Sequence, residues 1–94
     1  MRGYRFFEEY RGPELADSMG NVIAVQLMNE TPFIEPGSIC LQAICAPAGT
    51  RVPNSPVQPT YFNAEFLGTH CRRITEKQAR TIHPKLFEYL EKLS

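Results

Sequence analysis

The chain has no run of about 18 apolar residues, the length that a membrane-spanning helix needs, so we expect no membrane span. Ten Lys and Arg residues balance ten Asp and Glu residues. A net charge of zero excludes global electrostatic steering toward DNA or a membrane surface. Glu8 and Glu9 interrupt the apolar stretch that would have to follow the basic start of a signal peptide. We therefore expect a cytoplasmic protein without a signal peptide.

The motifs of common catalytic and cofactor sites are also missing. The sequence contains no GxGxxG, P-loop lysine, HExxH or GxSxG motif. Cys40, Cys45 and Cys71 lack the CxxC spacing of structural zinc sites. Cys40 and Cys45 would point to opposite faces of one strand. We expect no metal and no cofactor, and we interpret the cysteines as small buried residues of a protein in a reducing compartment.

Three apolar segments separated by turn-forming residues dominate the first half of the chain. Residues 4–10 (YRFFEEY) are aromatic and alternate in part, whereas 22–28 (VIAVQLM) and 39–46 (ICLQAICA) are almost continuously apolar. These patterns predict three β-strands, the last two buried. Residues 47–59 carry four of the eight prolines, which excludes a regular helix and allows at most an edge strand there.

The segment 60–74 fits either of two structures. It can form a strand with alternate apolar residues on one face, or a helix with apolar residues at i, i+4 and i+7. The helical set is Leu67, Cys71 and Ile74. We favour a helix over about 64–73 with Asn63 as its N-cap, because the helical set is the longer one.

The C-terminal segment carries clear helix signals. Thr75 and Gln78 have the spacing of a capping box, which predicts a helix that begins at residue 76. Pro84 either starts a new helix after a short first one, over 76–82 and 84–93, or kinks a single helix. One apolar stripe of the final helix is predicted to face the core. The stripe consists of Ile82, Leu86, Tyr89 and Leu93.

These elements predict one small α+β domain over residues 1–94. A three-stranded antiparallel sheet is followed by two or three short C-terminal helices packed on one face. Because two strands are apolar on both sides, the second face also needs cover. A second subunit, the proline-rich segment or a ligand could provide it, and we expect a homodimer as the simplest solution.

Positive charge is concentrated near the C-terminus. Within residues 70–85, five Lys and Arg residues face only Glu76. On a helix, several of these would share one face that could hold phosphates or an acidic protein. The candidate binding residues are Arg72, Arg73, Lys77 and Arg80. The alternative is an ordinary solvated helix face.

Two other positions could belong to an enzyme site. Glu8 and Glu9 point to opposite sides of a strand and cannot act as an acid/base pair. Glu8 among aromatic residues is a pocket candidate, and its alternative is a solvated strand edge. His83 directly before Pro84 fits a helix junction better than a catalytic base. We assign no catalytic residue.

The leading hypothesis is a small non-enzymatic binding or interaction module that forms a homodimer. Exposed aromatic side chains would supply its contacts, since tyrosine keeps a polar end at interfaces. The predicted contact residues are Tyr4, Phe6, Tyr10 and Tyr61. A nucleic-acid accessory protein that uses the basic residues is the second hypothesis, and an enzyme that uses Glu8 or His83 is the third.

Four stretches of the sequence suggest a relationship. They are YRFFEEY, GNVIAV, PNSPV and RRITEKQARTIHPKLF. Together they resemble short uncharacterised bacterial proteins of the sort carried on mobile gene cassettes. The resemblance implies a bacterial, cytosolic setting, and it implies no activity and no functional residues.

Overall fold

The computed structural model describes residues 2–10, 18–38, 40–46 and 57–93. Within them, the chain forms six strands and three helices. The strands are β1 (Tyr4–Tyr10), β2 (Ser18–Met28), β3 (Thr31–Pro32), β4 (Cys40–Ala46), β5 (Gln58–Asn63) and β6 (Cys71–Ile74). The helices are α1 (Ala64–His70), α2 (Glu76–Ile82) and α3 (Pro84–Leu93).

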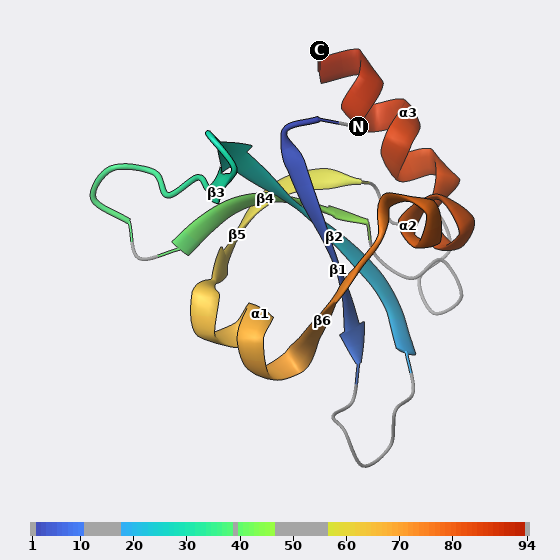
Figure 1. Cartoon of the computed structure of the whole chain (residues 1–94), viewed down its shortest axis with the longest axis horizontal. Helices are drawn as coiled ribbons and strands as arrows, with labels where there is room; N and C mark the ends of the chain where they lie inside the picture. Colours follow the sequence, from blue (N-terminus) through green and yellow to red (C-terminus); the bar gives the residue numbers. More distant parts are fainter. Residues whose placement is uncertain (1, 11–17, 39, 47–56, 94) are drawn as a thin grey trace.

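The strands form one antiparallel sheet in the order β5-β4-β2-β1-β6, with β3 paired to β2 (Figure 1). The α+β class and the antiparallel sheet are confirmed, but the prediction of three strands is wrong. Two of the missed strands are very short, and β5 takes in Pro59 from the proline-rich segment. An edge strand tolerates this proline because one side of its backbone needs no partner. Residues 47–56 lie outside the described part of the chain.

Residues 60–74 combine the two structures that the sequence allowed. The chain ends β5, forms α1 and then enters β6. Asn63 caps α1 as predicted, because its side chain accepts a hydrogen bond of 2.8 Å from the Glu65 N–H. The helix ends at His70 rather than near residue 73, since the following four residues pair with β1. Backbone pairing along the free edge of β1 therefore overrides the helical spacing.

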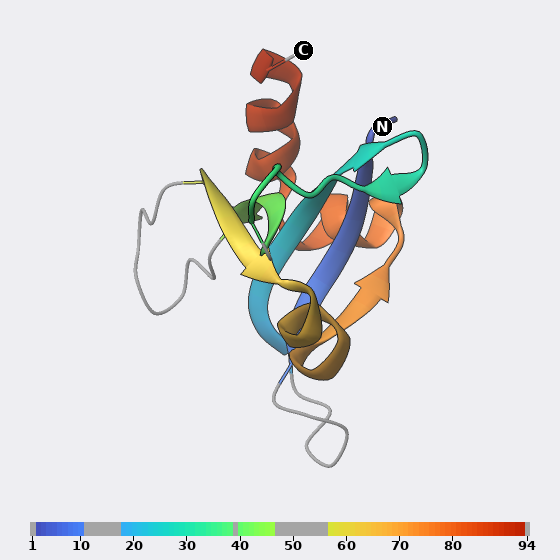
Figure 2. The same cartoon turned by 90° about the vertical axis from the view of Figure 1, so that its left-hand side faces the viewer.

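Helices cover both faces of the sheet (Figures 1 and 2). α2 and α3 pack on the first face, and α1 packs on the second. The core under α2 and α3 contains Phe6, Val22, Ala24, Ile44, Ala46, Ile74, Ala79, Leu86, Phe87 and Leu90. The core under α1 contains Ile23, Val25, Leu41, Ala43, Leu67 and Cys71. Only two of the three helices thus lie on the predicted face, and the second face is buried without a second subunit.

The bounds of α2 and α3 match the prediction. Thr75 and Gln78 form the expected capping box, and α3 begins at Pro84. The predicted apolar stripe is partly wrong, because Ile82 and Leu93 are exposed. His83 has a non-helical backbone and separates the two helices, so Ile82 does not continue the buried face of α3. The residues that α3 buries are Leu86, Phe87 and Leu90.

Candidate functional site

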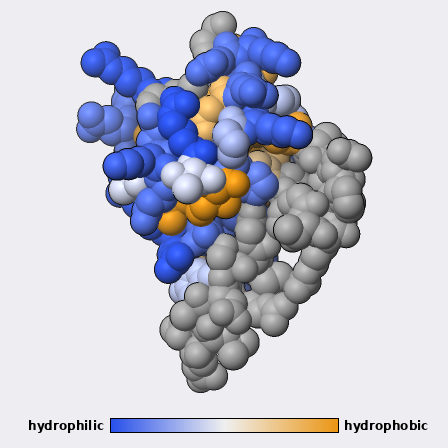
Figure 3. All heavy atoms as spheres, turned by 90° about the vertical axis from the view of Figure 1, so that its right-hand side faces the viewer, coloured by the Kyte–Doolittle hydropathy of each residue, from blue (hydrophilic) through white to orange (hydrophobic). Residues whose placement is uncertain are grey.

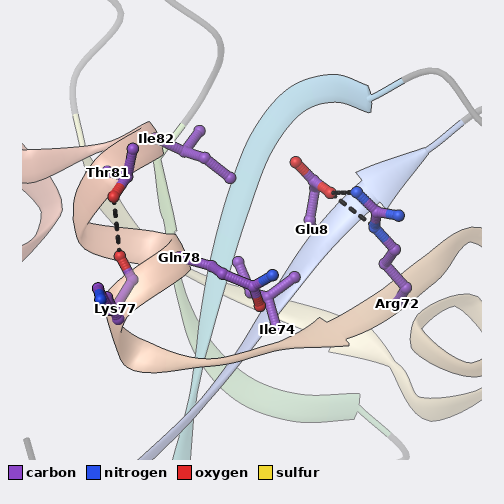
Figure 4. Close-up of a pocket in the computed structure, with 7 residues that line it drawn as sticks. All are labelled: Glu8, Arg72, Ile74, Lys77, Gln78, Thr81 and Ile82. Carbon is purple, nitrogen blue, oxygen red and sulfur yellow. Dashed lines mark hydrogen bonds and ion pairs between the residues drawn. The ribbon is translucent and has the colours of Figure 1, made fainter.

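Glu8 is the one charged side chain that is buried in the described part of the chain, with 3% of its surface exposed. It lies directly opposite Arg72 in the β1–β6 pairing. The Nε and Nη2 atoms of Arg72 lie 2.7 Å and 2.6 Å from the same oxygen of Glu8 (Figure 4). The expectation of a solvated strand edge is wrong, because β6 covers the edge of β1. A buried carboxylate requires such a partner, since losing water without one is costly.

A hollow of about 290 Å³ opens beside this ion pair. It is lined by Glu8, Arg72, Ile74, Lys77, Gln78, Thr81 and Ile82. Figure 4 shows the ion pair on one side of this hollow and the side chains of α2 on the other. We call it the Glu8 hollow. It combines a charged pair, polar groups and two aliphatic side chains.

A second hollow of about 470 Å³ lies where β6 leads into α2. It is lined by Tyr4, Arg5, Phe6, Arg73, Ile74, Thr75, Glu76 and Gln78, and we call it the Arg5 hollow. Ile74 and Gln78 line both hollows, so the two adjoin. Together they form what we call the β6–α2 groove.

Arg5 is a cation of this groove that the sequence did not single out. Its Nη2 atom donates a hydrogen bond of 3.2 Å to the backbone carbonyl of Glu30. Its Nε atom is buried and has no hydrogen-bond acceptor within the described structure. Arg73 pairs with Phe7, two residues from Arg5 on the same strand face, so the two arginines are diagonal neighbours on that face.

The lining of the groove carries more net positive charge than the protein as a whole. Its lining contains four cations and two carboxylates, which leaves an excess of two positive charges in a chain whose net charge is zero. The cations are Arg5, Arg72, Arg73 and Lys77, and the carboxylates are Glu8 and Glu76. Such a concentration of one sign raises the local concentration of anions.

The predicted basic residues do not share one helical face. Arg72 and Arg73 belong to β6 and point to opposite sides of it, while Lys77 comes from α2. Arg80 lines neither hollow; its Nε atom lies 3.3 Å from a carboxylate oxygen of Glu76, and its guanidinium carbon lies 4.1 Å from the ring centre of Phe87. Three of the four predicted cations therefore line the groove, and Arg80 does not.

The predicted contact aromatics are mostly not exposed. Phe6 is 4% exposed and contacts Phe87 with ring centres 5.1 Å apart, so it is a core residue. Tyr4 and Tyr10 are half-buried, and burial raises the pKa of Tyr4. Tyr61 alone among the four is largely exposed, at 50%. The alternation of β1 places Phe6 on the face of the sheet that α2 and α3 cover.

The cysteines and histidines form no common site in the described residues. No group of three or more His, Cys, Asp and Glu side chains that could hold a metal occurs there. Cys71 is buried, as predicted, and burial together with Glu9 and Cys45 raises the pKa of its thiol to about 12. His83 is the C-cap of α2, which confirms the predicted helix junction, and it is not among the residues that line the groove.

No protein-family model, curated protein or solved structure matches this chain. None of the helices described here is both long enough and apolar enough to cross a membrane. Function must therefore be inferred from the groove itself.

Proposed function

We propose that this protein is a small binding module that takes an anionic ligand or partner in the β6–α2 groove. The observation that carries the proposal is that four cations from β1, β6 and α2 line two adjoining hollows, two cations in each. Arg72, Arg73 and Lys77 are close in the sequence, whereas Arg5 lies near the N-terminus, and the pairing of β6 with β1 brings it to them.

Arg72 has the properties of an anion-binding residue. Glu8 engages two of its N–H groups, while 57% of its side chain stays exposed. A guanidinium group carries five N–H donors, so donors remain for a ligand. The ion pair with Glu8 also limits the conformational freedom of the Arg72 side chain. This lowers the entropic cost of binding a ligand there.

Aliphatic side chains give the groove an apolar component. Ile74 lines both hollows, and Ile82, which is 37% exposed, borders the Glu8 hollow. Figure 3 shows apolar surface among hydrophilic side chains on the side of the molecule where α2 and α3 lie. A few polar groups around apolar lining are typical of ligand sites.

Homodimerisation remains part of the proposal, but its basis changes. The second sheet face is covered by α1, so it does not require a partner. The support is now the exposure of Ile34 and of Tyr61, either of which could lie in an interface. Their partners Leu41 and Gln42 are consecutive in β4, so the two side chains lie on opposite faces of the sheet. Light scattering should give roughly twice the chain mass of 10.7 kDa. A monomer at micromolar concentration would contradict it.

The nucleic-acid hypothesis has weaker support. Arg72, Arg73 and Lys77 line the groove and could contact phosphates. Arg80 is engaged by Glu76 and Phe87, and two carboxylates lie among the cations. The described lining is therefore less uniform in charge than the sequence suggested.

Retention on heparin-agarose at low salt tests whether the groove binds anions. The wild-type protein should be retained, and salt should release it steeply. Lys77→Gln should elute at lower salt, because Lys77 lines the Glu8 hollow. Lys85→Gln is the matched control, since Lys85 is also an exposed helical lysine but lies outside the groove, and its elution should not change. A wild-type protein that flows through contradicts the proposal.

A further inference from the structure

We infer that the occupant of the β6–α2 groove is an acidic peptide segment of another protein, with aliphatic side chains between its acidic ones. This inference rests on the proposed anion-binding function and names its partner. It follows from the placement of the carboxylates, the aliphatic lining and the arrangement of Arg5 and Arg73.

The two carboxylates of the groove disfavour a nucleic-acid backbone. Glu8 lines one hollow and Glu76 lines the other. A nucleic-acid strand carries a negative charge at every nucleotide, so it would place phosphates near both carboxylates. A peptide has no such fixed spacing, and its neutral residues can lie beside Glu8 and Glu76.

The apolar lining of the groove suits aliphatic side chains better than bases. Proteins that bind single-stranded nucleic acids stack bases on accessible aromatic rings. The aromatic residues of the groove are Tyr4, which is half-buried, and Phe6, which is buried. Ile74 and Ile82 instead provide aliphatic surface, against which a Leu or Val side chain of a peptide can pack.

Arg5 and Arg73 favour carboxylate groups. They come from neighbouring strands, share one sheet face and line the same hollow. A carboxylate accepts paired hydrogen bonds from a planar guanidinium group. The Nε atom of Arg5 has no acceptor in the described structure, so a donor is available if the side chain adjusts to a ligand.

Fluorescence anisotropy with three labelled probes tests the inference. The first probe is a peptide of alternating Asp and Val, the second replaces each Asp with Asn, and the third is oligothymidine of similar length. The Asp peptide should bind most tightly. Lys77→Gln and Arg73→Gln should each weaken its binding about two- to fivefold, as expected for the loss of one exposed ion pair. Lys85→Gln should leave binding unchanged.

The outcomes separate the inference from the proposed function. Tighter binding of oligothymidine, weakened by Lys77→Gln, would overturn the peptide inference and leave an anion-binding groove. Equal binding of the Asp and Asn peptides would also overturn it, because recognition would then not depend on acidic groups. If none of the probes binds and heparin retention is absent, both fail.

Discussion

At the scale of single residues, the candidate site depends on Glu8. Its carboxylate is buried next to core residues of β1, and the guanidinium group of Arg72 compensates for the lost water. The pair is asymmetric, since Glu8 is almost inaccessible while Arg72 is more than half exposed. Removing the arginine should therefore cost more than the small value of a surface ion pair.

We predict that Arg72→Met lowers the free energy of unfolding by about 2 kcal/mol, because Glu8 stays buried without its guanidinium partner. Urea denaturation followed by circular dichroism measures this change. Arg73→Met is the matched control, since Arg73 is the exposed neighbour in β6, and it should change stability by less than about 0.5 kcal/mol. Equal effects of the two substitutions would show that the ion pair does not stabilise the fold.

Ionisation of the Cys71 thiol should make the free energy of unfolding depend on pH in the alkaline range. The fold raises the pKa of its thiol from 9.0 to about 12, through burial and then the charges of Glu9 and Cys45. Below pH 9.0 the thiol is neutral in both states, and its contribution to stability is complete. As the pH rises from 9.0 toward about 12, the unfolded chain ionises first, so the free energy of unfolding falls.

The measurement is a series of urea denaturation curves over this alkaline range for the wild type and for Cys71→Ala. The variant should lose stability less steeply as the pH rises, although its absolute stability is lower because a buried side chain is shortened. Parallel slopes for the two proteins would contradict a raised thiol pKa.

At the scale of elements, local signals and long-range pairing had different predictive value. Thr75, Gln78 and Pro84 set the ends of α2 and α3, and these helices match the prediction. β3 and β6 have only two and four residues and exist because a neighbouring strand accepts their backbone groups. No local periodicity marks such strands, and this explains why the sequence predicted three strands and not six.

The capping box offers a direct test of the local signals. Thr75→Ala should lower the free energy of unfolding by about 1 kcal/mol, because the N–H of Gln78 loses the hydroxyl that caps it at 3.1 Å. Thr81→Ala is the control in the same helix, where the hydroxyl only donates to the carbonyl of Lys77. That variant should change stability little, and a larger loss there than in Thr75→Ala would contradict the role of the cap.

The edges of the sheet influence how the protein can associate. β5 carries Pro59 and the four-residue β6 carries two arginines, features that discourage pairing with the edge of another sheet. A dimer built by joining sheet edges is therefore disfavoured. Association through the side chain of Ile34 on one face, or of Tyr61 on the other, does not meet this obstacle.

At the scale of the whole molecule, the groove is a product of the fold. Glu8 and Arg72 are 64 positions apart, and only the pairing of β1 with β6 joins them. The sequence predicted Arg72, Arg73 and Lys77 from their cluster of charge, although it assigned them to a helix. It named Glu8 as a pocket candidate but did not predict its pairing with Arg72, and it missed Arg5, because a single sequence does not reveal which distant strand lies beside β1.

The claim that β6 and α2 form the binding surface is tested most directly by mapping amide chemical shifts in a ¹⁵N-labelled sample. The acidic Asp–Val peptide is the titrant. We predict that the amides of β6, of α2 and of Arg5 shift as the peptide is added, while those of α1 and β5 stay in place. Shifts confined to α1, β5 or the end of α3 would contradict the account.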